Sequence, residues 1–402
     1  MSGPTPETAS TEDSDAIILA LNAGSSSLKF ALFRLSAGEG EVRLAEGAAE
    51  GVGLDRGRLW FRSPGSAVSI DKPETLIDYD AAVHAAFDAI DNGELPSPAA
   101  VGHRLVHGGP RHQQPERVDA SLLESLRAAI PYAPLHLPSE LGVIEAVRAR
   151  YPDLPQVACF DTSFFGSLPD VARRLPLPRK LHDQGIRRYG FHGLSYEYLV
   201  EALGSNARGR AIFAHLGNGA SMVALRDGTP QDTTMGFTPS GGFMMGTRTG
   251  DLDPGVLLYL LDGGMSPGDL AHLVNHESGL LGVSGSTSDM KRLLERRIDD
   301  AEAGLAFEMF CYQIRKFIGG FAAVLGGVDC LVFTGGIGEH AAAVRDRVCS
   351  GLDFLGIRLD AARNHDGQGI ISAAGSPCTV RVVSTDEARM IARHTRRIVF
   401  RR

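Results

Sequence analysis

Three short segments rich in glycine and serine each follow an apolar run of the chain. They are residues 22–27 (NAGSSS), 217–221 (GNGAS) and 335–338 (GGIG). Glycine lets the backbone approach an anion closely, and the exposed N–H groups of such turns form concavities that bind phosphate. One such segment alone is more often a plain hairpin turn, but three in one chain favour phosphate binding. A P-loop is excluded because no GxxxxGK(S/T) stretch occurs, and residues 335–338 lack the GxGxxG pattern of a Rossmann opening.

Basic side chains lie beside these turns and in two further glycine-rich segments. Lys29 follows the first turn, Arg104 lies in residues 102–109 (GHRLVHGG), and Arg248 lies in residues 246–250 (GTRTG). An arginine between small residues has no helix surface for its stem to cover, so we expect both guanidinium groups to point into a cleft. The alternative is that each is a surface arginine in a flexible loop.

Two further side chains could carry or orient a proton. Asp161 directly follows the apolar residues 156–160, a position where catalytic and metal-directing carboxylates are common. Its structural alternative is a turn or helix cap. His192 lies between glycine and aromatic residues in 189–193 (YGFHG), and an isolated histidine of this kind is as often structural as catalytic.

The segments that position these side chains follow a pattern that occurs twice. Residues 16–21 and 28–35 read as two strands around the first glycine-rich turn, and residues 211–216 and 222–225 repeat this arrangement around the second. The two pairs align at one constant offset, close to half of the chain length. Repetition at that distance predicts duplication of a domain-sized unit, although two short hairpins can also match by chance.

The remaining pattern mixes strands with crossover helices, which predicts an α/β fold. Buried strands are expected at residues 156–160, 330–333 and 379–383. Helical spacing predicts helices at 121–130, 139–151, 286–297, 301–325 and 341–352, and a last helix capped by Asp386. Ser121 and Glu124 have the spacing of a capping box at the start of the first of these helices.

Length and composition limit the classes of protein that remain. The chain has 402 residues, too many for one simple core, so two domains are expected. A net charge of −8 argues against nucleic-acid binding. Residues 1–14 are polar and predict a disordered tail without a signal peptide. The most apolar later stretch, 318–333, is interrupted by glycine and aspartate, so no membrane span is expected. Five cysteines without a CxxC pair indicate thiols in a reducing compartment, and hence a cytoplasmic protein.

Taken together, these segments resemble the acetate kinase family. The resemblance covers the chain after the tail, in the family's order, and rests on residues 21–30, 102–109, 189–193, 215–221, 235–239, 244–248, 250–254 and 335–339. It implies the duplicated ribonuclease H-like fold of the actin-like ATPases, shared by actin, hexokinase and the heat-shock chaperone ATPase, with two lobes and a central cleft that holds ATP. It also implies a homodimer formed largely through the second lobe.

The resemblance further implies where the lobes begin and end. After the tail at 1–14, residues 15–163 plus 388–402 would form an N-terminal lobe on the acetate and phosphate side. Residues 164–387 would form a C-terminal lobe that binds the nucleotide and dimerises.

Roles for single residues also follow from the resemblance. Arg104 would bind the carboxylate of acetate, Arg248 would meet the transferring phosphoryl group, and His192 would contact the transition state. Asp161 matches the residue usually described as a proton donor or acceptor. Two positions would direct Mg²⁺, with Mn²⁺ as an alternative ion: Asn22 and Glu387.

Two larger sets of residues complete the implied site for acetate or acetyl phosphate and for ATP or ADP. An apolar pocket for the methyl group of acetate would be formed by Val106, Leu135, Phe191 and Pro239. The nucleotide would be bound by Ser25, Ser27, Lys29, His215, Leu216, Gly217, Asn218, Gly219, Asp289, Met290, Lys291, Gly336, Ile337, Gly338, Glu339 and His340.

The chain departs from the family's usual pattern at several positions. Lys291 replaces an arginine that lies against adenine, and lysine lacks a planar group for stacking. His340 and Asp386 replace asparagines, so these positions bear on nucleotide choice and metal geometry. Three more departures lie near the site but not at its central charges: Phe165, Leu137 and Tyr196.

A carboxylate acceptor makes demands that differ from those of a hydroxyl. Aliphatic carboxyls titrate near pKa ~4, so acetate is ionised at pH 7 and needs no general base. It needs its repulsion from ATP cancelled and its oxygen held in line with the γ-phosphorus. These demands favour a site of Arg104, Arg248, His192 and Mg²⁺. We therefore expect Asp161 to orient an arginine or a metal-bound water rather than to act as a base.

Two alternatives remain at this point. One is another kinase of the same fold that phosphorylates propionate, butyrate or a sugar hydroxyl. A sugar hydroxyl would need Asp161 as a base and would leave Arg104 without a purpose. The other is an actin-like or chaperone-like module that binds partners in response to ATP, which would not need the two arginines. Dependence of ATP turnover on added carboxylate distinguishes a carboxylate kinase from both.

Overall fold

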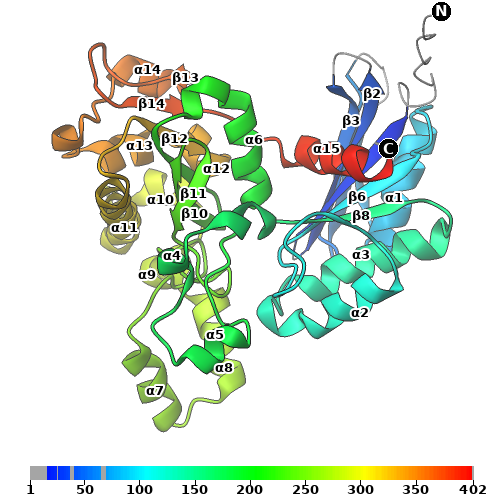
Figure 1. Ribbon diagram of the computed structural model, residues 1–402, viewed down its shortest axis with the longest axis horizontal. Helices are drawn as coiled ribbons and strands as arrows, with labels where there is room; N and C mark the ends of the chain where they lie inside the picture. The colour runs from blue at the N-terminus through cyan, green and yellow to red at the C-terminus, as the bar shows by residue number, and fades with distance from the viewer. Residues whose placement is uncertain (1–15, 25, 37–39, 65–68, 401–402) are drawn as a thin grey trace, which may run out of the picture. The chain divides into compact units, whose positions relative to one another are not determined.

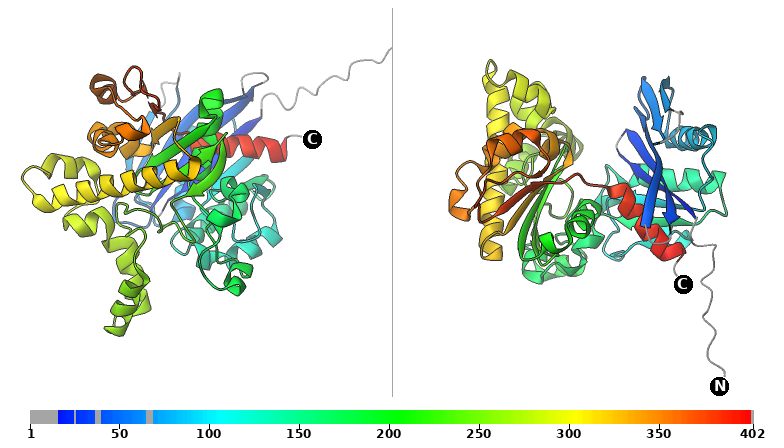
Figure 2. Two further views of the ribbon diagram at one scale, coloured as in Figure 1. Left: turned by 60° about the vertical axis from the view of Figure 1, so that its left-hand side comes forward. Right: turned by 90° about the horizontal axis from the view of Figure 1, so that it is seen from above.

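A computed structural model describes residues 16–24, 26–36, 40–64 and 69–400. The expected disordered tail at 1–14 lies outside these residues. The chain divides into two compact units, whose elements are drawn in Figures 1 and 2. Unit 1 holds the residues up to Ser163 and those from Asp386 onward, and unit 2 runs from Phe164 to Thr385. The return to unit 1 thus starts ahead of the implied position 388, and Glu387 belongs to unit 1.

Unit 1 is built on one mixed sheet. Its strands are β1 (Ile17–Ala23), β2 (Ser27–Ser36), β3 (Gly40–Glu50), β4 (Gly57–Arg62), β5 (Ser69–Glu74), β6 (Ala100–Leu105), β7 (Glu116–Arg117) and β8 (Gln156–Phe160). In the described residues they lie in the order β5-β4-β3-β2-β1-β6-β8-β7. β1 pairs antiparallel with β2 and parallel with β6, and β6 is parallel to β8. The strands expected at 16–21, 28–35 and 156–160 are confirmed.

Helices cover both faces of this sheet. On one face, α1 (Tyr79–Asn92) and α3 (Leu137–Arg150) enclose a core that includes Val101 of β6. On the other face, α15 (Glu387–Val399) packs against β1 and β6. Gly102 faces α15, because successive residues of a strand point to opposite faces. A Cβ atom at Gly102 would lie 2.2 Å from Oγ1 of Thr395 and 2.5 Å from Cγ2 of Ile391, so the close approach of α15 requires glycine here.

Unit 2 repeats the strand order of unit 1. Its strands are β9 (Arg210–Leu216), β10 (Ala220–Arg226), β11 (Thr229–Thr233), β12 (Cys330–Thr334), β13 (Gly369–Ile370) and β14 (Thr379–Val382), in the order β11-β10-β9-β12-β14-β13. β9 pairs antiparallel with β10 and parallel with β12, and β12 is parallel to β14. The series β3-β2-β1-β6-β8 has the same directions as β11-β10-β9-β12-β14. This shared topology confirms the duplicated α/β fold.

The helices of unit 2 are α4 (Asp170–Arg173), α5 (Arg179–Asp183), α6 (Gly193–Leu203), α7 (Pro254–Asp262), α8 (Pro267–His272), α9 (Gly279–Ser284), α10 (Met290–Arg296), α11 (Ala301–Leu325), α12 (Gly335–His340), α13 (Ala342–Cys349) and α14 (Ala361–Asp366). α6 and α11 lie on opposite sides of the sheet (Figures 1 and 2). α6 packs through Tyr196, Leu199 and Leu203 on Phe213 and Val223 of the central hairpin. The helix expected at 301–325 is confirmed at both ends.

One expected helix cap is wrong. The capping box at Ser121 and Glu124 does not form, because α2 (Ala120–Ala128) begins earlier. Asp119 has an extended backbone, and its side chain accepts a hydrogen bond from the N–H of Leu122 at 2.8 Å. Aspartate is among the strongest N-cap residues, so it determines the start of the helix and leaves Ser121 inside the first turn.

One further helix start differs from the expected one. α10 begins at Met290 rather than at 286, because Oγ of Ser284 accepts hydrogen bonds from the N–H groups of Ser286 and Thr287 and holds a turn there. Asp289 then caps the helix through the N–H of Lys291. The glycine-rich residues 335–338, which follow β12, form the first turn of α12.

Two global properties follow from the described residues. None of the helices that the structure describes combines the length and apolar content needed to cross a membrane. All five cysteines are buried free thiols.

Candidate active site

Four of the predicted residues lie at one edge of the unit 1 sheet. β1, β6 and β8 are parallel, so their carboxyl ends meet at the same edge. Asn22 is the register partner of Arg104, and Asp161 directly follows β8. Glu387, the first residue of α15, accepts a hydrogen bond at Oε2 from Nδ2 of Asn22 at 3.1 Å. The sheet and α15 thus bring together residues that are far apart in the sequence.

Arg104 and Asp161 form a buried ion pair. Nε and Nη2 of Arg104 donate to the same oxygen, Oδ2 of Asp161, at 3.1 and 2.5 Å. The other oxygen, Oδ1, is buried and has no hydrogen-bond partner among the described residues. Burial lowers the pKa of Arg104, but the negative charges of Asp161, Glu140 and Glu387 outweigh burial and raise it overall. The guanidinium group therefore remains charged.

A third buried carboxylate, Glu140, is absent from the residues predicted by the sequence. Its Oε2 accepts a hydrogen bond from the N–H of Val106 at 3.0 Å, and its Oε1 lies 3.7 Å from Nη1 of Arg104. Burial raises the pKa of Glu140 to about 8, although Arg104 and the Val106 N–H act in the opposite direction. The signal that could have found it is its place on the apolar face of α3, where the buried residues include Leu137, Leu141 and Ile144.

A divalent cation fits the oxygen atoms at this edge. Burial, and then the charge of Asp161, raise the pKa of Glu387 against the influence of Arg104 and Lys29. A further positive charge nearby would therefore stabilise the ionised form of Glu387. Oδ1 of Asp161 is a second oxygen that a cation could contact, since it is buried and has no hydrogen-bond partner in the described structure. No cluster of three or more His, Cys, Asp and Glu ligands occurs in the described ranges. The protein would supply few ligands and nucleotide phosphates the rest, as is common for Mg²⁺.

The other predicted residues of unit 1 differ in how far their side chains are buried. Ser27 and Lys29 lie on β2, with the Lys29 side chain exposed, and Val106 is buried directly after β6. Leu135 is 38% exposed, so its side chain is not packed in the core of unit 1. Ser25 lies outside the described residues.

In unit 2, His192 directly precedes α6 with a φ of 59°, a backbone conformation that is uncommon for residues other than glycine and that concentrates at functional sites. Its Nδ1 lies 2.8 Å from Oγ of Ser221. Its ring stacks on that of His215, with centroids 4.3 Å apart and planes 13° apart. A Cβ atom at Gly219 would lie 3.5 Å from Nε2 of His192 and 3.6 Å from Nη1 of Arg248. Both side chains therefore border the glycine-rich turn.

The loop that carries Arg248 packs directly on this turn. The N–H of Gly246 donates to the carbonyl of Asn218 at 3.0 Å. A Cβ atom at Gly246 would lie 1.9 Å from Oδ1 of Asn218, so a larger residue here would displace the Asn218 side chain. Nη1 of Arg248 donates to the carbonyl of Pro239 at 3.0 Å, which fixes the guanidinium group beside the turn. Pro239 and Phe191 are both buried.

A pocket of about 640 Å³ lies between three segments of unit 2 that are distant in the sequence. Its volume is in the usual range for small-molecule sites. Of the predicted nucleotide residues it contains Asn218, Asp289, Met290, Lys291, Gly336, Ile337 and His340, together with Ser288, Leu294 and Ala341. The carboxylate of Glu339 instead accepts hydrogen bonds from the N–H of Gly335 at 3.0 Å and from Oγ of Ser384 at 2.7 Å. Glu339 thus secures the start of α12.

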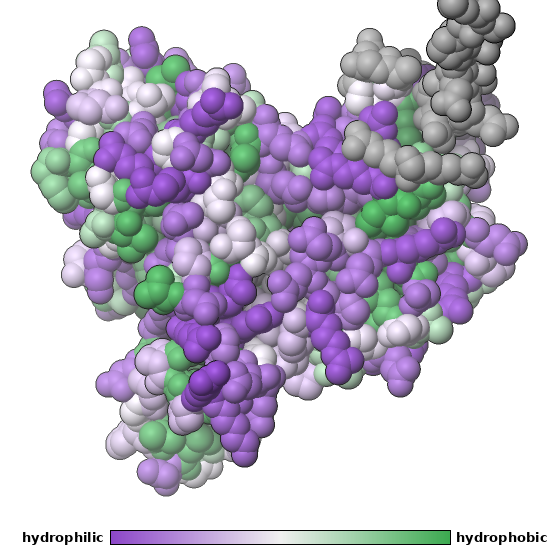
Figure 3. Space-filling view, viewed as in Figure 1, coloured by the Kyte–Doolittle hydropathy of each residue, from purple (hydrophilic) through white to green (hydrophobic). Residues whose placement is uncertain are grey.

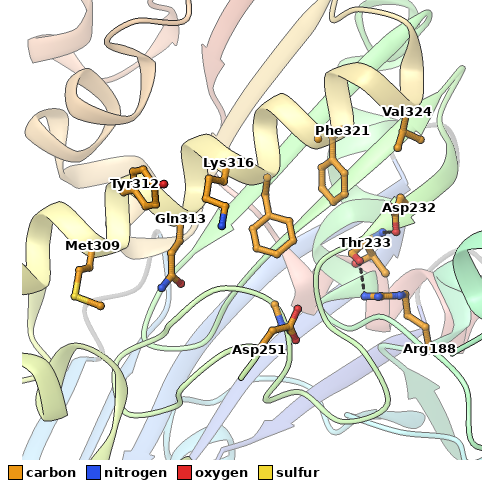
Figure 4. A pocket seen from close by; sticks show the side chains of 13 residues that line it. Arg188, Asp232, Thr233, Asp251, Met309, Tyr312, Gln313, Lys316, Phe321 and Val324 are labelled. Carbon is orange, nitrogen blue, oxygen red and sulfur yellow. Dashed lines mark hydrogen bonds between the residues drawn. The ribbon is translucent and has the colours of Figure 1, made fainter. Parts of the chain in front are cut away.

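A second pocket of unit 2, of about 680 Å³, contains none of the predicted site residues. Apolar side chains of α11, including Phe321 and Val324, line one side of it, and Arg188 and Asp251 line the other (Figure 4). Arg188 already donates hydrogen bonds to the carbonyls of Thr233 and its neighbours. This pocket is therefore not part of the candidate active site.

Comparison with known proteins identifies the family. The sequence model of the acetokinase family matches residues 17–393. The acetate kinase of Methylocella silvestris is 44% identical over 397 residues, which cover 94% of this chain and 96% of the relative. The crystal structure of Porphyromonas gingivalis acetate kinase has a TM-score of 0.83 at 38% identity, and that of a propionate kinase from Francisella tularensis has 0.89 at 36%. Each covers 96% of this chain and 100% of the known one. The chain belongs to the acetokinase family.

Proposed function

We propose that this chain is an acetate kinase that transfers the γ-phosphoryl group of ATP to acetate in a reversible, in-line reaction. A carboxylate oxygen of acetate bonds to the γ-phosphorus while the bond from this phosphorus to the bridging oxygen breaks. The products are acetyl phosphate and ADP. In a member of the acetokinase family, the observation that carries the proposal is the buried, charged guanidinium group of Arg104. Such a group binds a small carboxylate through charge-assisted hydrogen bonds.

Asp161 orients Arg104 in this proposal. Its Oδ2 accepts from Nε and Nη2, which leaves Nη1 as the nitrogen that Asp161 does not engage. Nη1 lies 3.7 Å from Oε1 of Glu140, beyond normal hydrogen-bond distance. This edge of the guanidinium group would receive acetate. Because acetate is already ionised at neutral pH, Asp161 has no proton to remove from it.

The residues of unit 2 act on the other substrate. Arg248 and His192 contact the transferring phosphoryl group, and residues 215–219 bind the phosphates of ATP. The nucleoside occupies the 640 Å³ pocket beside Lys291 and His340. Because these two side chains replace the arginine and asparagine usual in the family, we expect them to affect nucleotide choice most directly.

The metal ion of the reaction is Mg²⁺ in this proposal, and Mn²⁺ is an alternative. Glu387 and Asn22 would hold it, with Asp161 close by. When bound, it would neutralise the charge that the phosphates carry during transfer. Glu387 is held ready for this role by its hydrogen bond from Asn22 and by its position in the first turn of α15.

We also propose a cytoplasmic homodimer formed through unit 2. α7 and α8 bury none of their side chains within the described structure. α7 nevertheless carries Leu258 and Tyr259, which are 61% and 78% exposed. Figure 3 shows apolar surface on this part of the chain, and Tyr312 and Val324 of α11 are exposed beside the pocket of Figure 4. A second copy would cover these apolar side chains. Free, buried cysteines suit the reducing cytoplasm.

One assay tests the function. ADP formation is measured with acetate, propionate, butyrate and glycerol, and hydroxylamine traps any acyl phosphate. We expect acetate first, propionate weaker and butyrate poor, because the proposed methyl pocket of Val106, Leu135, Phe191 and Pro239 discriminates each methylene by about 1–3 kcal/mol. Propionate is the second candidate, since a propionate kinase is among the similar structures. ATP turnover that does not depend on carboxylate would refute the proposal, and equal kcat/KM for acetate and butyrate would refute the pocket.

A further inference from the structure

Two buried hydroxyl groups extend from the imidazole of His192 into the core of unit 2. Oγ of Ser221 lies 2.8 Å from Nδ1 of His192 and 2.6 Å from Oη of Tyr196. Tyr196 and Ser221 are completely buried. Tyr196 comes from α6 and Ser221 from β10, so the packing of the helix on the sheet fixes the contact.

The chemistry of the two hydroxyls determines the direction of these hydrogen bonds. A serine hydroxyl has one proton and two lone pairs, so Ser221 can donate to only one of these two neighbours. A phenol, with a pKa of about 10, is a stronger acid than an aliphatic alcohol and hence the better donor. This difference in acidity favours the arrangement in which Tyr196 donates to Ser221 and Ser221 donates to Nδ1 of His192. A neutral imidazole that accepts at Nδ1 carries its proton on Nε2.

The neighbouring histidine favours the same state. The stacked rings of His192 and His215 have centroids only 4.3 Å apart, and two imidazolium ions at this distance would repel each other. Nδ1 of His215 lies 2.9 Å from Oγ of Ser195, so this ring is oriented by a hydroxyl as well. Nε2 of His192 is the atom that borders Gly219 and faces the same turn as Arg248. The proton thus lies on the edge of the ring that is turned toward the phosphate-binding turn.

We propose that Tyr196 is a positioning residue that, through Ser221, holds His192 as the neutral tautomer with its proton on Nε2. The role of His192 in transfer rests on the proposed function. In that reaction, Nε2–H donates a hydrogen bond to an oxygen of the transferring phosphoryl group, and no proton is exchanged. Tyr196 does not touch the substrates and acts only through Ser221 and His192.

Nitrogen NMR of the full chain with ¹⁵N-labelled histidine tests the proposal, because protonated and unprotonated ring nitrogens have distinct signals. The variant His192→Gln identifies the signals of His192. In the wild type at neutral pH, we expect a protonated Nε2 and an unprotonated Nδ1. In Tyr196→Phe, the proton should distribute over both nitrogens. The kcat should fall about 3- to 10-fold, as expected for one lost hydrogen bond, with KM for acetate and ATP nearly unchanged. Ser221→Ala should lower kcat further, and Ser221→Thr, which keeps a hydroxyl, should restore most of it.

The matched control is Tyr189→Phe. It removes another buried phenol, whose hydroxyl donates to the carbonyl of Gly185 at 2.8 Å, and should leave the signals of His192 unchanged. A wild-type spectrum with the proton on Nδ1, or with both nitrogens protonated, would overturn the proposal even if no variant folds. A Tyr196→Phe spectrum identical to that of the wild type would also overturn it. The spectra are recorded without turnover, so they are independent of the acetate assay, whose failure would count against the proposed function alone.

Discussion

The substitution Asp161→Asn separates an orienting carboxylate from a catalytic base. Asparagine has nearly the shape of aspartate and can still place one oxygen against Arg104, but it carries no charge and cannot accept a proton. If Asp161 only holds Arg104, the substitution weakens acetate binding. If Asp161 is a base, the substitution stops the chemical step.

The structure sets the size of the expected effect. Arg104 donates two hydrogen bonds to Asp161, at 3.1 and 2.5 Å. Hydrogen bonds to charged groups contribute about 1.5–3 kcal/mol each and are roughly twice as strong as neutral ones. Losing the charge but keeping the oxygen should therefore cost about 1.5–3 kcal/mol. This corresponds to a fall of about 10- to 100-fold in kcat/KM for acetate. The fall should appear mainly in KM for acetate, because Arg104 binds the ground state.

The assay is steady-state formation of acyl hydroxamate at saturating Mg²⁺ and ATP, with acetate varied. Asp329→Asn is the matched control, because Asp329 forms a comparable pair with Arg210, at 3.0 and 2.5 Å, away from the predicted site residues. It should leave both kinetic constants unchanged. A fall in kcat of about 10²–10⁴, the range of general base catalysis, with an unchanged KM for acetate would refute the reasoning.

Three further predictions follow from the same groups. Arg104→Ala should mainly raise KM for acetate, and Arg248→Ala should mainly lower kcat. Arg248→Lys should restore only part of kcat, since lysine lacks the planar fork of arginine. Kinetics with each substrate varied would show the reverse pattern if the two roles are exchanged. Glu387→Ala should raise the Mg²⁺ concentration required for half-maximal rate while the melting temperature stays close to that of the wild type, and an unaltered Mg²⁺ titration would remove Glu387 from the metal site. Glu140 has a pKa of about 8 in the folded state and an ordinary value of 4.5. Between pH 4.5 and pH 8 the folded state therefore binds more protons than the unfolded state. The free energy of unfolding should fall as the pH rises through this range. Glu140→Gln should abolish that loss in denaturation curves from pH 5 to 8, whereas equal pH slopes in both proteins would show that Glu140 is ionised in the fold.

The elements that local apolar spacing determines are predicted well from the sequence. The limits of β8 (Gln156–Phe160) and α11 (Ala301–Leu325) agree with the expected 156–160 and 301–325, because buried residues recur through their whole length. The starts of α2 and α10 are missed because several serine and aspartate side chains compete to bind the same backbone N–H groups. Spacing alone does not decide which of them caps the helix.

The site is predicted only in part, for a related reason. Arg104 is conspicuous because it lies among small and apolar residues near the end of a strand, and Asp161 because it directly follows one. Glu140 is not, because its apolar neighbours on α3 are typical of any buried helix face. The bond between Asn22 and Glu387 joins residues 365 positions apart, and no local pattern anticipates it. Resemblance to a family supplied Glu387, and only the tertiary structure connects Tyr196 with His192.

The charges at the edge of unit 1 suggest a second role for the metal ion, in acetate binding as well as in nucleotide binding. With a pKa of about 8, Glu140 is mostly protonated at pH 7, and burial raises the pKa of Glu387 as well. The carboxyl groups of Asp161 and Glu387 lie at the same edge as Arg104, and in their ionised form they would repel an incoming anion. A cation held by Glu387 and close to Asp161 would offset the negative charge that these carboxylates present to an incoming acetate, while Asp161 keeps Arg104 oriented. Acetate would then meet less repulsion beside Arg104, and the metal that binds ATP would also prepare the site of the second substrate.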